Sequence, residues 1–215
     1  DLSHGFNNSH TLRNAPPLQN LAWYSEFHHD GGITHLDLQP LAPITNPVEM
    51  AETIDNVLNK LRADAVYRSM FAAAFGSEEI NTKRMTQALS QFMLTMVSAD
   101  SKYDKVMRGE ATFNLPESLG YDIFKQKCAS CHKEPLFTDL SYRNTGIPMD
   151  AVLQDKGRMR ITQNPADSLK FRVPSLRNIM VSSYYGHDGR FFDVYQVLEH
   201  YNSGVINGPT TDPLV

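Results

Sequence analysis

The sequence predicts a mainly α-helical fold built from two related halves. Three segments place apolar residues at helical spacing, and two short patterns recur at an offset of 158 residues. Hydrophobic residues make up 41% of the 215-residue chain and charged residues 20%, which is typical of a globular protein. No apolar run approaches the ~20 residues of a membrane-spanning helix. We therefore expect a compact fold and no membrane span.

The first predicted helix begins at Asn46-Pro47-Val48-Glu49. Asn46 suits the N-cap, Pro47 is tolerated at the first helical position, and Glu49 completes a capping box. Apolar residues at helical spacing then form one face. They are Ile54, Val57, Leu58 and Leu61.

Two further helices are predicted downstream. The second has an apolar face whose methionines we interpret as core residues. That face comprises Met85, Leu89, Phe92, Met93 and Met96. The third begins at Asn114-Leu115-Pro116-Glu117 and continues into Cys128, and we place the domain boundary before it, giving domains at 1–112 and 113–215. Residues 137–171 are rich in Gly, Pro, Asp and Asn and lack strand-like alternation, which predicts a long loop.

The two recurring patterns share one register. Pro16–Asn20 aligns with Pro174–Asn178, with three identities in five positions. Without a gap, His29-Asp30-Gly31 then aligns with His187-Asp188-Gly189. Two matches at one offset indicate an internal duplication.

The motif Cys128-Ala129-Ser130-Cys131-His132 predicts a covalently attached haem c. Its two thiols would form thioethers with the haem, and His132 would be an axial iron ligand. A zinc site would need more soft ligands, and the chain has no other cysteine. A redox dithiol would need a βαβ setting, which the helical flanks do not provide. Because such haems are attached outside the bacterial cytoplasm, we expect a periplasmic protein.

The duplication also predicts a second haem. At an offset of 158, the counterpart of the Cys128–His132 motif falls before residue 1. We therefore expect a first haem-attachment segment upstream of this chain and two haems in the intact protein. The formal net charge is −4 with no basic cluster, which argues against a nucleic-acid partner.

From about Ser3 to Gly204, these features resemble the bacterial di-haem cytochrome c peroxidase family, including its MauG-type members. Besides the haem motif, the resemblance depends on Phe171–Asn178, His187–Gly189 and Gln39–Met50. It implies two cytochrome c-like domains with long loops wrapping haem. The C-terminal haem would take electrons from a small donor protein, a cytochrome c or a cupredoxin, and the N-terminal haem would reduce hydrogen peroxide. The alternatives are a MauG-like enzyme that oxidises a protein substrate and a mono-haem electron carrier. A homodimer is compatible with each.

The resemblance further implies a peroxide pocket of Gln39, Pro43 and Glu49, whose spacing matches the family pattern. A carboxylate above an open iron position can move a proton between peroxide oxygens, and an amide can hold the bound oxygen. The competing interpretation is that Glu49 only completes the capping box. We favour the pocket.

The sixth ligand of the C-terminal haem is Met in ordinary family members and Tyr in MauG-type members. Ungapped counting from His187–Gly189 reaches Tyr201, with His200 as the competitor. We prefer Tyr201, because it shares an inward-facing helical face with Val194, Val197 and Leu198. A tyrosinate should lower the haem potential relative to Met ligation.

The resemblance also implies a calcium ion between the halves. Its ligands would be the Asn14 side chain and the backbone carbonyls of Ser182 and Tyr184, where the family usually has Thr and Pro. Carbonyl oxygens suit calcium whatever side chain they carry. His29 replaces the tryptophan that the family usually places between the haems, which puts electron transfer through that position in doubt.

Overall fold

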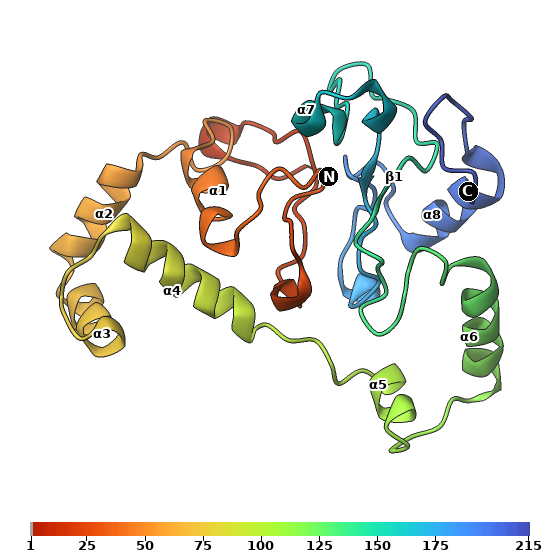
Figure 1. Cartoon of the computed structure of the whole chain (residues 1–215), viewed down its shortest axis with the longest axis horizontal. Coiled ribbons are helices and arrows are strands. Elements are labelled where there is room, and N and C mark those ends of the chain that lie inside the picture. The colour runs from red at the N-terminus through yellow and green to blue at the C-terminus, as the bar shows by residue number, and fades with distance from the viewer. Residues whose placement is uncertain (1) are drawn as a thin grey trace.

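The computed structural model describes residues 2–215 and confirms a mainly helical fold. Figure 1 shows two groups of elements side by side, α1–α4 in one and α5–α8 with the strands in the other, joined by an extended segment after α4. The bounds are α1 Leu41–Thr45, α2 Ile54–Ala63, α3 Ala65–Phe75, α4 Thr82–Thr95, α5 Lys102–Met107, α6 Leu115–Lys127, β1 Tyr142–Arg143, α7 Met159–Thr162, β2 Phe171–Arg172 and α8 Val194–Glu199.

Short turns of other helix types complete the fold. Five are 3₁₀ turns among the described residues, at Phe6–Asn8, Leu21–Trp23, Leu36–Leu38, Pro165–Asp167 and Ile179–Val181. A π-helical turn, His200–Gly204, directly follows α8. Such turns are rare and are often found at functional sites.

The predicted helix start at Asn46 is wrong. The backbone amide of Glu49 donates to the Asn46 carbonyl (3.0 Å), and Asn46 Nδ2 donates to Glu49 Oε1 (3.1 Å), so these residues form a closed turn. Ala51 then has a left-handed φ of 51°, through which a helix does not continue. The helix begins only after Thr53, whose hydroxyl oxygen accepts from the Asn56 amide.

The other two predicted helices are present as α4 and α6. At the start of α6, Asn114 Oδ1 accepts from the Glu117 amide (2.9 Å), and Glu117 Oε2 accepts from the Asn114 amide (2.8 Å). This is the predicted capping box. Residues 137–171 are mostly irregular, as predicted, although Tyr142 and Arg143 pair antiparallel with Arg172 and Phe171.

The hydrophobic core lies almost entirely before residue 100. In the described part of the chain, Val173 is the one fully buried apolar residue of the second half. The first half has two buried clusters: Ile44, Leu58, Phe71, Ile80 and Met85, and Leu21, Phe27 and Met93. Polar groups dominate the buried residues of the second half. The two halves are therefore stabilised in different ways.

The two repeated patterns have the same backbone conformation. Asn20 and Asn178 both have φ of 62°, and each precedes a 3₁₀ turn. An isolated antiparallel bridge follows at matching positions in each half, Phe27 with Ile33 and Tyr185 with Phe191. All of these features are 158 residues apart, so the sequence repeat is also a repeat of local structure.

The halves exchange a reciprocal pair of backbone hydrogen bonds. The Asn14 amide donates to the His187 carbonyl (2.8 Å), and the Arg172 amide donates to the His29 carbonyl (2.7 Å). Asn14 and Arg172 occupy equivalent positions at the 158-residue offset, and so do His29 and His187. Each half therefore donates a hydrogen bond to the equivalent histidine carbonyl of the other half.

Buried ion pairs reinforce this contact. Arg13 binds Asp30 of its own half (2.6 Å) and Asp155 of the other (2.5 and 2.9 Å). The Tyr142 hydroxyl donates to Glu26 across the same boundary (2.6 Å). A Cβ added to Gly31, whose φ is 73°, would lie 2.0 Å from the Tyr142 hydroxyl oxygen, so glycine is needed there.

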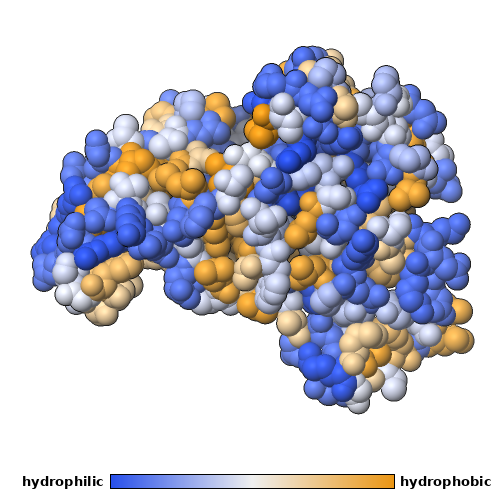
Figure 2. Space-filling model, in the orientation of Figure 1, coloured by the Kyte–Doolittle hydropathy of each residue, from blue (hydrophilic) through white to orange (hydrophobic). Residues whose placement is uncertain are grey.

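The surface differs between the two groups of elements. Figure 2 shows apolar side chains gathered over the part that contains α1 and α4, whereas the part around α7 is largely hydrophilic. Exposed residues of α4 include Leu89, Phe92 and Leu94. Within residues 2–215, no helix has the length and apolar character needed to cross a bilayer.

Candidate haem-binding site

One turn of chain at the end of α6 brings the two cysteines and the histidine together. Cys128 is the C-cap of α6, and its amide donates to the Phe124 carbonyl (2.8 Å). The amides of Cys131 and His132 then both donate to the Cys128 carbonyl (3.1 and 2.9 Å). Both cysteines are free thiols and half-buried. This arrangement fits the covalent tethering of one porphyrin by two adjacent thiols.

The His132 ring is oriented by two backbone carbonyls. Its Nδ1 lies 3.1 Å from the Phe137 carbonyl oxygen and 3.1 Å from the Pro174 carbonyl oxygen. Because a carbonyl can only accept, Nδ1 carries the proton, which leaves Nε2 with a lone pair that is available to a metal ion. Burial lowers the pKa of His132, which further favours the neutral imidazole.

The loop that follows His132, the proximal loop (132–138), is fastened to the segment 173–177. Thr138 Oγ1 donates to the Val173 carbonyl (2.6 Å). Ser175 Oγ donates to the Leu136 carbonyl (2.6 Å). Both carbonyls that face His132 therefore lie on segments that are bound to each other.

Tyr201 lies in the π-helical turn, within electrostatic range of the haem motif. Desolvation raises the pKa of Tyr201, and the negative charges that the Cys131 and Cys128 thiols can carry raise it further. The side chain is nevertheless 45% exposed, and Leu198 is 55% exposed, so protein does not cover this face as the sequence predicted.

His200 is turned the other way. Its Nε2 donates to the Thr145 carbonyl (2.8 Å), and its ring contacts Phe191. Its Nδ1 would lie 3.1 Å from a Cβ added to Gly204, so that nitrogen faces the backbone. His200 is buried with both ring nitrogens directed at protein, which favours Tyr201 as the iron ligand.

The predicted peroxide-pocket residues lie around α1. Gln39 lies two residues before the start of the helix, and Pro43 lies within it. The Pro43 carbonyl accepts from the Met50 amide (3.2 Å), which holds the Glu49 turn against the helix. No hydrogen bond joins Gln39 to Glu49 within residues 2–215. The half-buried Glu49 carboxyl accepts from Asn46 at Oε1.

His28 was missed by the sequence analysis. Desolvation lowers its pKa most strongly, while the nearby carboxylates Asp30 and Glu49 act to raise it. The His28 ring therefore lies within electrostatic range of the Glu49 carboxyl. Its position directly before His29-Asp30-Gly31 was the available signal, but nothing in the sequence placed it near Glu49.

The proposed calcium ligands are partly together. Asn14 Nδ2 contacts the Tyr184 carbonyl oxygen. The Ser182 carbonyl accepts from the Tyr185 hydroxyl (2.6 Å), leaving a second lone pair. For the part of the chain that the structure describes, no group of three or more His, Cys, Asp or Glu side chains is arranged to hold a metal ion.

Comparison with known families identifies a match at the start of the chain. Residues 1–112 match the model of the family described as di-haem cytochrome c peroxidase. Among solved structures, a MauG-like protein associated with microbial copper homeostasis superposes with a TM-score of 0.86 at 32% identity. That match covers 98% of this chain and 69% of the other.

Two curated relatives are similar over most of the chain. The methylamine utilization protein MauG of Methylorubrum extorquens is 35% identical over 198 residues, 89% of this chain and 55% of the relative. The cytochrome c551 peroxidase of Nitrosomonas europaea is 36% identical over 190 residues, 86% of this chain and 57% of the relative. The chain thus spans little more than half the length of these relatives.

Proposed function

The chain belongs to the di-haem cytochrome c peroxidase family, and from that premise we propose that it acts, within its whole protein, as a periplasmic haem c oxidoreductase. The reaction is the reduction of hydrogen peroxide with electrons from a small redox protein, a cytochrome c or a cupredoxin. The observation that carries the proposal is the turn at the end of α6, which brings two thiols together with an imidazole whose Nδ1 is engaged by carbonyls. That turn suits haem attachment and iron ligation together.

The two-haem architecture follows from the repeat. Equal backbone conformations at the 158-residue offset and the reciprocal bonds between the halves support an internal duplication. We assign the cytochrome c-like domains to residues 1–112 and 113–215, with loops wrapping each haem.

The residues of the second half have separate roles in holding the haem. Cys128 and Cys131 would tether it, and His132 Nε2 and the Tyr201 hydroxyl would be the two protein ligands of its iron. A haem c held in this way supplies one-electron transfer at iron. The carbonyl partners of Nδ1 make His132 a stronger electron donor to the metal.

Glu49 and Gln39 act in the first half. Glu49 accepts from Asn46 at Oε1, and none of the hydrogen bonds of the described residues involves Oε2, which leaves that oxygen for a proton. A carboxylate in this state can carry a proton between two peroxide oxygens, while the Gln39 amide orients the substrate. Because the Asn46 contact belongs to a turn and not to a helical capping box, it does not compete with this role.

A second function, MauG-like oxidation of a protein substrate, is favoured by one observation. Tyr201, and not a methionine, lies within electrostatic range of the haem thiols, whose negative charges raise its pKa. A hard anionic ligand stabilises oxidised iron and lowers its potential. A haem of low potential is suited to sharing oxidising equivalents with a partner haem. It is less suited to the role of a high-potential haem that passes electrons to the peroxide site.

Calcium is proposed between the halves, at Asn14 with the carbonyls of Ser182 and Tyr184. The contact of the Asn14 amide with the Tyr184 carbonyl brings two of these groups together. Either orientation of the amide places an oxygen ligand nearby, and hard oxygen donors suit calcium.

Haem counting tests the first proposal. The whole protein, matured in a cell that attaches haem c, should have the mass of its polypeptide plus two haems and should oxidise a reduced cytochrome when peroxide is added.

Replacing Glu49 tests its role in proton transfer. In the same whole protein, Glu49→Gln should lower peroxide turnover about a hundredfold or more, because the amide keeps the Asn46 contact but cannot carry the proton. Glu52→Gln, at a nearby carboxylate paired with Lys60, is the control and should retain activity. Unchanged turnover in Glu49→Gln would remove Glu49 from the mechanism.

Replacing Tyr201 tests the second function. Tyr201→Phe should raise the potential of the C-terminal haem and convert its ferric spectrum from low spin to high spin, because the anionic ligand is lost. His200→Gln should leave the spectrum unchanged, since His200 bonds to Thr145. A spectrum that changes only in His200→Gln would reverse the ligand assignment. A Tyr201 variant that keeps oxidising a protein partner would count against the MauG-like function.

A further inference from the structure

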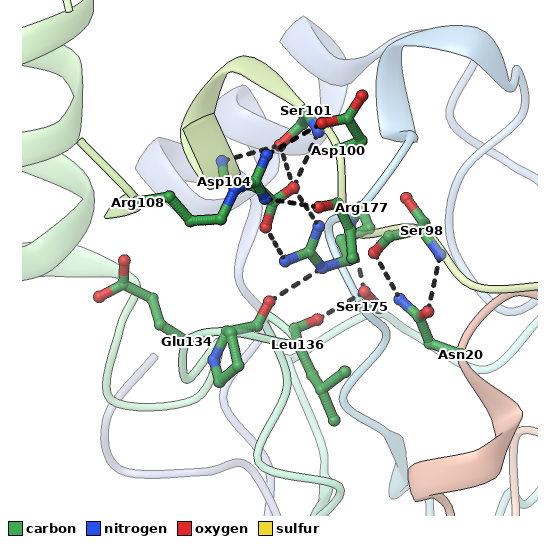
Figure 3. Close-up of polar contacts among 12 residues, drawn as sticks. Asn20, Ser98, Asp100, Ser101, Asp104, Arg108, Glu134, Leu136, Ser175 and Arg177 are labelled. Atoms are coloured by element: carbon green, nitrogen blue, oxygen red, sulfur yellow. Dashed lines mark hydrogen bonds and ion pairs between the residues drawn. The ribbon is translucent and has the colours of Figure 1, made fainter. Parts of the chain in front are cut away.

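A buried ion pair ties the segment between the halves to the C-terminal haem site. Asp104 of α5 receives two hydrogen bonds from Arg177, at 2.9 and 2.7 Å, in the paired geometry that arginine makes with carboxylates. Their side chains are 10% and 7% exposed. Figure 3 shows Arg177 pointing to Asp104, with Ser175 and Leu136 directly beside it.

Arg177 also holds the proximal loop. Its Nε donates to the Pro135 carbonyl (2.9 Å), while the two terminal nitrogens bind Asp104. Its guanidinium lies 5.5 Å from the centroid of the Phe137 ring. One planar group therefore joins α5, the proximal loop and the segment 173–177.

The two carbonyls that orient His132 lie on the segments that Arg177 joins. The Phe137 carbonyl belongs to the proximal loop, and the Pro174 carbonyl belongs to the segment 173–177. Ser175 and Thr138 add two further connections between them, through the carbonyls of Leu136 and Val173. The distance from His132 Nδ1 to both carbonyls thus depends on how closely Arg177 holds the two segments together.

We propose that Arg177, fixed by Asp104, is a positioning residue that sets the hydrogen bonds of His132 and thereby the reduction potential of the haem bound there. This inference rests on the proposed function, because it needs a haem on His132. Donation from Nδ1–H strengthens electron donation by Nε2 to the metal, which favours ferric iron. When Arg177 no longer holds the segments, the hydrogen bonds lengthen and ferrous iron is favoured.

Arg177→Lys is the decisive variant, because it keeps the charge but loses the fork that reaches Asp104 and Pro135 together. In the haem-loaded protein we expect about a tenfold rise in the ferrous-to-ferric ratio at a fixed applied potential, equivalent to about 59 mV for one electron. The electron paramagnetic resonance spectrum of the ferric haem should change as well. Asp104→Asn, which preserves side-chain shape, should shift the potential in the same direction.

Asp100→Asn is the matched control. Asp100 also lies in the segment before α5 and pairs with Arg108, but the two side chains are 75% and 43% exposed. The haem reduction potential of Asp100→Asn should equal that of the parent protein. If Arg177→Lys does not fold, Ser175→Ala removes the neighbouring Leu136 contact and should give a smaller shift of the same sign.

Three results decide the proposal. Potentials and spectra that stay unchanged in Arg177→Lys and Ser175→Ala, with only lower resistance to unfolding, would show a purely structural role. A shift in Asp104→Asn without one in Arg177→Lys would show an effect of charge and would also overturn positioning. A parent protein that carries no haem would instead defeat the proposed function.

Discussion

The two repeated loops, residues 20–33 and 178–191, have the same backbone but different partners. In the first, Asp30 binds Arg13, which also reaches Asp155 in the other half. In the second, Asp188 binds Arg190 only two residues further along the chain. The first loop is therefore tied to the opposite half, whereas the ion pair of the second is local.

The histidines of the two loops also have different partners, each within its own half. His29 Nε2 donates to the Asn14 carbonyl (2.9 Å), whereas the His187 ring stacks on Phe171 with centroids 3.7 Å apart. The comparison shows that residues which fix backbone conformation preserve a repeat, while the side chains between them can acquire separate tasks.

The largest difference between the loops should appear when their arginines are removed. Arg13→Ala leaves Asp155, whose side chain is 2% exposed, without its principal cation, and should cost about 3–5 kcal/mol of unfolding free energy. Arg190→Ala breaks a pair whose arginine is 26% exposed and should cost about 1–2 kcal/mol. Urea unfolding of both variants measures the difference. Equal losses would show that the first loop is no more strongly tied than the second.

A smaller difference is expected at the equivalent asparagines. Asn20 is buried and exchanges two hydrogen bonds with the Ser98 backbone, whereas the exposed Asn178 donates once to the Ser98 hydroxyl. Asn20→Ala should therefore cost about 2–3 kcal/mol and Asn178→Ala about 1 kcal/mol. Asn178→Gly should recover part of that cost, because φ is 62°. Thermal unfolding at matched haem content provides the test, and a greater loss in Asn178→Ala would contradict it.

The smallest effect is the dependence of stability on pH. Burial alone would raise the pKa of Asp155, but its hydrogen bond to Arg13 and the positive charge there outweigh burial and lower it. A carboxylate with a lowered pKa stabilises the fold above its ordinary value near 4, and that contribution is lost as the pH falls. Asp155→Asn should flatten the loss of unfolding free energy below pH 4 by at most about 1.4 kcal/mol per pH unit. A slope identical to that of the parent would place the titration elsewhere.

Local signals in the sequence predicted the parts of the fold that depend on neighbours along the chain. The capping box of Asn114 and Glu117 located the start of α6, and the same helix positions Cys128. The apparent capping box at Asn46 failed, because Asn46 and Glu49 bond to each other within a turn and Ala51 reverses the backbone. The sequence could not show which segment would begin a helix. Both segments have an Asn, a Glu three residues later and one Pro between them.

Contacts between distant residues could not be predicted from one sequence. Arg13 and Asp155 are 142 residues apart, and Asp104 and Arg177 are 73 apart. Charged residues are common on any surface, so nothing marked these four as buried partners. The haem motif needed no such information, because its three groups are adjacent.

The reciprocal bonds of Asn14 and Arg172 have the pattern that two identical chains make about a two-fold axis. An ancestral single copy could have filled its exposed peptide oxygens by associating with another copy. Fusion into one polypeptide keeps the partners at a high effective concentration whatever the amount of protein in the cell. Released from the need to recognise itself, each copy is then free to acquire its own ion-pair partners, as Asp30 and Asp188 have done.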